Sequence, residues 1–165
     1  MRIARLLKHL VTPGWLARRS FSNKALSQIE KAIRASEQEH DGELRFVIEG
    51  PLHLPYLFRP RPARARAEEL FARLRVWDTE HNSGVLIYVQ LVDRRIEIVA
   101  DRGISKKVEQ TEWDAVCRAM EASFRKKLYA EGALEAIASV TRILARRFPA
   151  QGENPNELPD KPLVL

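Results

Sequence analysis

The sequence predicts an α/β protein with a mixed sheet and helices on the faces of that sheet. Residues 85–92 form a continuous apolar run, which suits a central strand. A polar turn at residues 93–94 returns the chain into a second strand at residues 95–100, so the two strands form a hairpin. A further strand is predicted at residues 43–49, and a long helical pattern separates it from the hairpin. Strands separated by long helices are typical of mixed sheets covered by helices.

The chain begins with a basic amphipathic segment, residues 1–21. Apolar residues recur at helical spacing over residues 2–11, and basic residues lie largely on the other face. The first 29 residues carry six basic and no acidic side chains, whereas the other 136 carry 22 of each. Lys8 and His9 interrupt the apolar run, and no small-residue cleavage site follows. We therefore expect a retained segment rather than a secretory signal.

Residues 22–148 are predicted to form a single α/β domain. Ser22 is expected to cap its first helix, which closes near residues 40–42 with Gly42 as the stop. Periodicity predicts three further helices, at residues 63–76, 109–127 and 133–148. Four prolines predict an irregular loop at residues 50–62, and a break is expected at residues 130–132. Residues 149–165 are predicted to be an extended tail, docked at its end.

Composition bounds the class of protein. A chain of 165 residues with 45% hydrophobic residues suits one domain with a real core. The single cysteine, Cys117, rules out an intrachain disulfide framework. No run of 18 or more apolar residues occurs, which argues against a transmembrane helix.

The predicted hairpin gathers polar residues at one end of the sheet. If residues 93–94 form a two-residue turn, Leu86 lies opposite Asp101, and one face of the ribbon is wholly apolar. The loop at residues 78–84 then meets the end of the second strand, with Glu97 four residues before Asp101 on the same face. A site could form where these two loops meet.

Carboxylate and amide oxygens at that end are reasonable ligands for Ca²⁺ or Mg²⁺. A carboxylate with a histidine could also position water for phosphoester hydrolysis, for which His81 and Asp101 are the candidate catalytic residues. The alternative is a solvated loop with ordinary strand-end charges. The candidate metal ligands on this part of the sheet are Asp78, Glu80, Asn82, Glu97 and Asp101, and Asp93, in the turn at the other end of the hairpin, is a further candidate.

The N-terminal segment is the stronger candidate for a partner. Its apolar face could lie on a membrane with its basic face toward anionic lipid, or it could pack on the domain itself. The candidate contact residues are Arg2, Arg5, Leu6, Leu7, Lys8, Leu10, Trp15, Arg18 and Arg19. A second basic run holds four arginines without an intervening acid, at positions Arg59, Arg61, Arg64 and Arg66. We interpret that run as a solvated loop and expect no nucleic acid partner, since no aromatic residues are interleaved with it.

Residues from about 43 to 140 resemble the TPM domain family. The resemblance is carried by residues 69–71, by residues 82–87, by residues 93–98, by residues 101–104, and by Phe124, Tyr129 and Gly132. It implies a three-layer α/β/α sandwich with a mixed central sheet. For some members of the family it also implies acid phosphatase activity or calcium binding, and for others a role in assembling or repairing membrane complexes. The acidic residues of those proposed sites correspond to Asp93, Glu97 and Asp101.

Two functional hypotheses follow. The favoured one is a non-catalytic binding or assembly module that acts with a protein or membrane-associated partner, in the cytoplasm or on the inner face of the membrane. The sequence establishes no cofactor, and Ca²⁺ and Mg²⁺ are the candidate ions. The alternative is a phosphatase-like hydrolase that depends on a divalent metal, using Asp78, Glu80, His81, Glu97 and Asp101.

Overall fold

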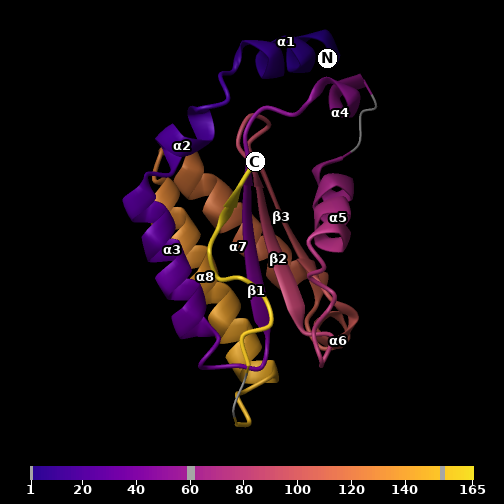
Figure 1. The fold of residues 1–165 in the computed structure, drawn as a ribbon, viewed down its shortest axis with the longest axis vertical. Coiled ribbons are helices and arrows are strands. Elements are labelled where there is room, and N and C mark those ends of the chain that lie inside the picture. The colour runs from indigo at the N-terminus through magenta and orange to yellow at the C-terminus, as the bar shows by residue number, and fades with distance from the viewer. Residues whose placement is uncertain (1, 59–61, 153–154) are drawn as a thin grey trace.

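A computed structural model describes residues 2–58, 62–152 and 155–165 of the chain (Figure 1). The order of elements is close to the predicted one. The helices are α1 (Arg2–Val11), α2 (Leu16–Ser20), α3 (Asn23–Ser36), α4 (Leu54–Phe58), α5 (Ala63–Arg73), α6 (Arg102–Ser105), α7 (Gln110–Arg125) and α8 (Tyr129–Arg147). The strands are β1 (Glu43–Glu49), β2 (Gly84–Gln90), β3 (Arg95–Ala100) and β4 (Leu163–Val164).

The four strands form one open mixed sheet in the order β3-β2-β1-β4. β1 runs parallel to β2 and β4, whereas β2 and β3 are antiparallel. The parallel strands end beneath α1 and α4, at what we call the α1 end of the molecule (Figure 1). The opposite end, where β1 and β2 begin, carries α6 and is called the α6 end.

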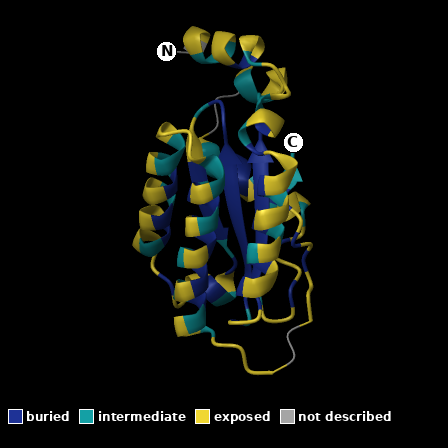
Figure 2. Cartoon of the chain, turned by 90° about the vertical axis from the view of Figure 1, so that its left-hand side faces the viewer, coloured by how far each residue is buried: buried dark blue, intermediate teal, exposed yellow. Residues whose placement is uncertain are grey.

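Helices cover both faces of the sheet, as the α/β prediction requires. On one face, alternate strand residues such as Phe46, Ile87 and Ile98 pack with α3, α7 and α8. On the other face, Leu86 and Tyr88 pack with α5 and with the C-terminal strap, residues 155–165. The sheet is therefore buried between two helical layers, which leave their outer faces in solvent (Figure 2).

The β2–β3 turn is longer than predicted. Leu86 pairs with Val99 rather than with Asp101, so the predicted register was wrong by two residues. The side chain of Gln90 ends the ladder, because its Oε1 accepts hydrogen bonds from the amides of Val92 (2.7 Å) and Asp93 (3.0 Å). A shift of two residues leaves every side chain on its face. The prediction of one apolar and one mixed face was therefore correct despite the wrong register.

Two helix boundaries also differ from the predictions. Ser22 caps α3 as expected, with its Oγ accepting a hydrogen bond from the amide of Ala25 at 3.2 Å, but α3 ends at Ser36. The predicted break at residues 130–132 was wrong, because α8 begins at Tyr129 and runs through Gly132. A Cβ atom at Gly132 would lie 2.8 Å from the Cβ of Ser123. Glycine is therefore required here because two helices approach each other closely, and it does not end a helix.

The tail docks at its end, as predicted. Leu163 pairs with Val47 as part of β4, and Leu158 is buried with Leu86 and Tyr88 on the α5 side of the sheet. Arg45 binds the strap, because its Nη1 donates to the carbonyl oxygens of Pro159 and Lys161, each at 2.6 Å. Among the described helices, none has both the length and the apolar character needed to cross a bilayer.

Candidate functional site

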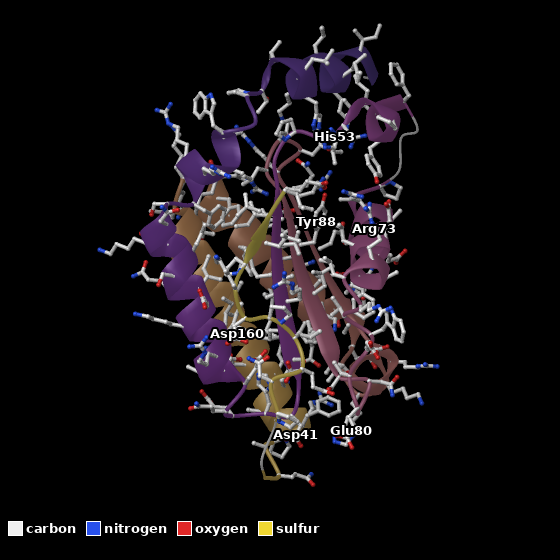
Figure 3. All side chains as sticks on the ribbon, viewed as in Figure 1. Asp41, His53, Arg73, Glu80, Tyr88 and Asp160 are labelled. Carbon is white, nitrogen blue, oxygen red and sulfur yellow. The ribbon has the colours of Figure 1, made fainter. Side chains whose placement is uncertain are left out.

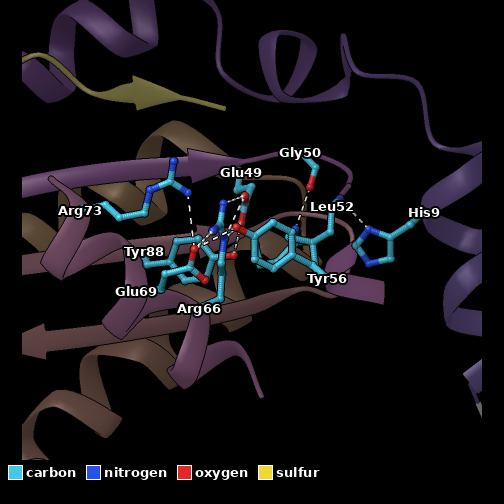
Figure 4. A network of polar contacts seen from close by, with 10 residues as sticks. His9, Glu49, Gly50, Leu52, Tyr56, Arg66, Glu69, Arg73 and Tyr88 are labelled. Carbon is cyan, nitrogen blue, oxygen red and sulfur yellow. Dashed lines mark hydrogen bonds and ion pairs between the residues drawn. The ribbon is translucent and has the colours of Figure 1, made fainter. Parts of the chain in front are cut away.

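Helix α1 is anchored to the domain by its polar side. Arg5 donates two hydrogen bonds to Oδ2 of Asp93, from Nε at 3.0 Å and from Nη2 at 2.7 Å. His9 is buried, and its Nε2 lies 3.1 Å from Oδ1 of the same carboxylate. The amide of Leu52 donates to Nδ1 of His9 at 3.0 Å (Figure 4). Because Nδ1 accepts this hydrogen bond, the proton of a neutral His9 lies on Nε2, and Nε2 donates a hydrogen bond to Asp93.

Asp93 is thus the centre of the anchor. Burial alone would raise the pKa of Asp93, but the hydrogen bonds from Arg5 and His9 outweigh that effect and lower the pKa. The carboxylate stays ionised and both of its oxygens are occupied. The predicted metal ligand Asp93 therefore lies at the α1 end and holds a helix.

The apolar side of α1 faces solvent. The most exposed large hydrophobic residues of this stretch are Ile3, at 73%, and Val11, at 76%. Five of the ten large hydrophobic residues exposed in the described chain fall between residues 3 and 15: Ile3, Leu7, Leu10, Val11 and Trp15. Leu54 and Phe58 of α4, which lies beside α1, are exposed as well (Figure 1). We call these seven residues the apolar platform. A contiguous exposed apolar patch is typical of a protein or membrane interaction site.

Exposed basic residues occur in the same segment as this platform. Lys8, Arg18 and Arg19 are exposed, and the guanidinium of Arg19 lies 5.5 Å from the centre of the Trp15 ring. Of the other predicted contact residues, Leu6 is half-buried, Arg5 is used by the anchor, and nothing is described of the Arg2 side chain. The structure therefore turns most of the predicted contact residues outward, but not Arg5.

A buried polar network lies beneath the anchor (Figure 4). Arg66 donates to Glu49 from Nη2 at 2.5 Å, and the hydroxyl of Tyr88 donates to the other oxygen of Glu49 at 2.5 Å. The guanidinium of Arg66 also lies 4.2 Å from the centre of the Tyr56 ring, and the Tyr56 hydroxyl donates to Glu69 at 2.8 Å. Burial lowers the pKa of Arg66, but Glu49 outweighs this and raises it.

This network is structural in its chemistry. Each oxygen of Glu49 accepts two hydrogen bonds, because Arg66 Nε also donates to both of them at 3.2 Å, so the acceptor positions of Glu49 are occupied. Burial first, and the neighbouring Glu49 charge second, raise the pKa of the Tyr88 hydroxyl, which stays protonated as a donor. The contact of Tyr56 with Arg66 ties α4 to α5, and so supports the segment that bonds to His9.

The sequence interpretation missed this network. The sequence places Arg66 in a basic run that is predicted to be solvated, but its side chain is only 10% exposed. A signal was present, because Arg66 precedes the apolar Leu70 by four residues and must share its helix face. Arg64 bonds to Glu68 and to the carbonyl of Ile98, whereas Arg59 and Arg61 lie outside the described residues.

The other predicted metal ligands, apart from Glu97, lie at or near the α6 end (Figure 3 labels Glu80). The two loops do meet there, because the amide of Gly103 donates to the carbonyl of Asn82 at 3.1 Å. Asp101 caps α6 by accepting from the amide of Arg102 at 2.7 Å, and Glu97 is half-buried within β3. Asp78, Glu80 and His81 are exposed.

Contacts between these loops are made by backbone atoms and do not assemble a ligand set. Across residues 2–58, 62–152 and 155–165, no three carboxylate, histidine or cysteine side chains are grouped so that they could hold one ion. The calcium or magnesium site and the catalytic roles of His81 and Asp101 stay predictions.

Fold and site together define an α/β protein with an open mixed sheet and a basic amphipathic helix docked where its parallel strands end. A family model for the TPM domain matches residues 18–143, and the chain belongs to that family. The predicted resemblance and the predicted fold class are confirmed.

Solved structures agree with this assignment. The BA42 protein of the psychrophilic bacterium Bizionia argentinensis is 27% identical, with a TM-score of 0.77 over 88% of this chain and 95% of that one. The N-terminal domain of a P. gingivalis protein is 18% identical, with a TM-score of 0.64 over 88% of this chain and 97% of that one, and shows the shared fold alone. No match was found among curated proteins.

Proposed function

We propose that this TPM domain protein is a non-catalytic binding module that attaches to an anionic membrane surface through α1. One observation carries the proposal: α1 docks by its polar residues Arg5 and His9 and leaves its apolar residues in solvent. A helix that served only to complete the core would dock the other way, because burying apolar surface is the main favourable term of packing.

The charge pattern supports lipid as the occupant. The first acid of the chain is Glu30, so the basic residues around the apolar platform face no acidic neighbour within their own segment. A short helix with an apolar side flanked by cations is typical of helices that lie in the interfacial plane of a bilayer. Each Lys or Arg near an anionic leaflet adds about 1 kcal/mol of attraction. The cytoplasmic leaflet is the anionic one, so the proposal places the protein at the inner face of the membrane.

Replacing both Leu7 and Leu10 with glutamate is expected to weaken binding to vesicles that contain phosphatidylglycerol by about tenfold or more. Both side chains are roughly half exposed, and burying the rest of a leucine side chain contributes about 1 kcal/mol or more for each. Cosedimentation of the full chain with vesicles of phosphatidylcholine alone, and of its mixture with phosphatidylglycerol, measures the partition coefficient.

The matched control is Trp77→Glu, which removes an exposed apolar side chain outside the platform. It should bind vesicles as the wild type does, and high salt should weaken both equally. Absence of binding by the wild type, or equal binding by the double variant, would overturn the membrane proposal and leave a protein partner for this face.

A further inference from the structure

A second feature of the α1 end is a cavity of about 90 Å³ beside the β2–β3 turn. It lies between that turn and the loop that joins α7 to α8, and Phe124 and Tyr129 contribute aromatic surface to it. Their ring centres are 5.1 Å apart. A water needs roughly 10–15 Å³ measured this way, so the space holds several waters or one tetrahedral oxyanion.

Charged side chains around the cavity are mostly cationic. Four basic residues and one acid line it: Arg94, Arg95, Arg125, Lys127 and Glu121. Glu121 lies 3.6 Å from Arg125 and so pairs with one of the four cations. Within the described part of the chain, the side chains of Arg94 and Lys127 make no hydrogen bond or ion pair. The cavity therefore carries an excess of positive charge that the protein itself does not neutralise.

The backbone makes Arg94 and Lys127 unexpected at their positions. Both have left-handed φ angles, 55° and 63°, where glycine is favoured. Lys127 follows α7 in a Schellman motif: the amides of Lys127 and Leu128 donate to the carbonyls of Phe124 (3.0 Å) and Ser123 (3.1 Å). Local conformation thus selects against both side chains. Arg75 is also left-handed, at 54°, but it lies 3.9 Å from Asp78 and does not line the cavity.

From the cavity and its unpaired cations, we infer that this site binds a phosphate group. Arginine and lysine form charge-assisted hydrogen bonds to phosphate oxygens, and the aromatic surface reduces the screening of those charges by water. The group is carried either by a free phosphate compound or by a lipid headgroup, since the chemistry of recognition is the same.

The phosphate site shares a structural element with the α1 anchor but does not depend on the proposed function. The β2–β3 turn contributes Asp93 to the anchor and Arg94 to the cavity. A protein that fails to bind vesicles can still bind phosphate, and the reverse also holds. An experiment can therefore reject membrane binding through α1 without rejecting phosphate binding in the cavity, and the reverse.

The test is a titration of the full ¹⁵N-labelled chain with inorganic phosphate at pH 7, at ionic strength held constant with sodium chloride, followed by ¹⁵N–¹H NMR. We expect saturable shifts confined to residues 91–95 and 124–129. Arg94→Gly and Lys127→Gly should each weaken binding by about fivefold or more, because each removes one charge-assisted contact. Both variants should fold, since glycine suits the left-handed backbone.

Arg75→Gly is the matched control, because it makes the same exchange at a left-handed position outside the cavity. It should bind phosphate as the wild type does. Absence of saturable shifts in the tens of millimolar, or an equal loss of affinity in all three variants, would overturn the site. A soluble short-chain phosphatidic acid that saturates the same shifts at lower concentration would identify a lipid headgroup, and tighter binding of inorganic phosphate would identify a free phosphate compound.

Discussion

Replacing Arg66 with methionine is expected to lower the free energy of unfolding by about 3–5 kcal/mol. Arg66 and Glu49 are both almost fully buried, with side chains only 10% and 5% exposed. Methionine fills similar space but leaves the Glu49 charge without its partner, and an unpaired buried charge is far more costly than a lost surface contact. Urea unfolding at pH 7, followed by circular dichroism, measures the loss.

Two further variants separate the buried charge from a general effect of losing an arginine. Arg73→Met, on the same helix but 63% exposed, should cost no more than about 1 kcal/mol. Adding Glu49→Gln to Arg66→Met should recover part of the stability, because no unpaired charge is then left in the interior. If Arg66→Met and Arg73→Met proved equally mild, Glu49 and Arg66 would not be the buried pair described here.

Much of this fold could be predicted because side-chain periodicity follows the backbone. The two faces of the β2–β3 hairpin could be predicted because side chains point to alternate sides along a strand. The prediction of the faces was correct despite the register error, because that error was an even number of residues. The longer turn could not be predicted, since it depends on the Gln90 side chain accepting from two amides. The break predicted at Gly132 was wrong for a similar reason, because the glycine is required by its close approach to Ser123 on another helix.

The candidate site was harder to predict, because it depends on contacts between residues far apart in sequence. Amphipathicity identified α1 and its exposed leucines, but it could not show that Arg5 and His9 would pair with Asp93, more than eighty positions away. Acidic residues at strand ends suggested a metal site, yet Asp93 lies at the opposite end of the hairpin from Asp101. Charge type alone does not distinguish an ion ligand from a helix anchor or a helix cap.

A cluster of buried acids near the C-terminal strap is expected to make the stability of the fold depend on pH. Burial is the main cause that raises the pKa of Glu37, to about 8, and the charges of Glu43 and Asp160 add to it. Burial likewise raises the pKa of Glu43 to about 7, against the hydrogen bonds it accepts from the amides of Glu157 and Leu158. A carboxyl group that is protonated in the folded state stabilises the fold below its ordinary pKa, and that stabilisation is lost as the pH rises through the folded value.

The free energy of unfolding is therefore expected to fall by several kcal/mol between about pH 5 and pH 8, since each pKa unit corresponds to about 1.4 kcal/mol. Glu37→Gln should reduce this dependence and be more stable than the wild type at pH 8 by about 2 kcal/mol or more. The amide oxygen can still accept from the amide of Leu44, which donates to Glu37 Oε1 at 2.8 Å, and the amide group can donate to Asp160 without a proton to lose. Urea unfolding at intervals from pH 5 to pH 8 measures both curves.

The exposed Glu39→Gln serves as the control for removing one negative charge at the same end of α3, and its curve should parallel that of the wild type. A residual slope in Glu37→Gln is expected from Glu43, and it should be smaller in the double variant Glu37→Gln with Glu43→Gln. Parallel curves for Glu37→Gln and the wild type would show that Glu37 is already ionised in the folded protein. In that case no proton would lie between Glu37 and Asp160.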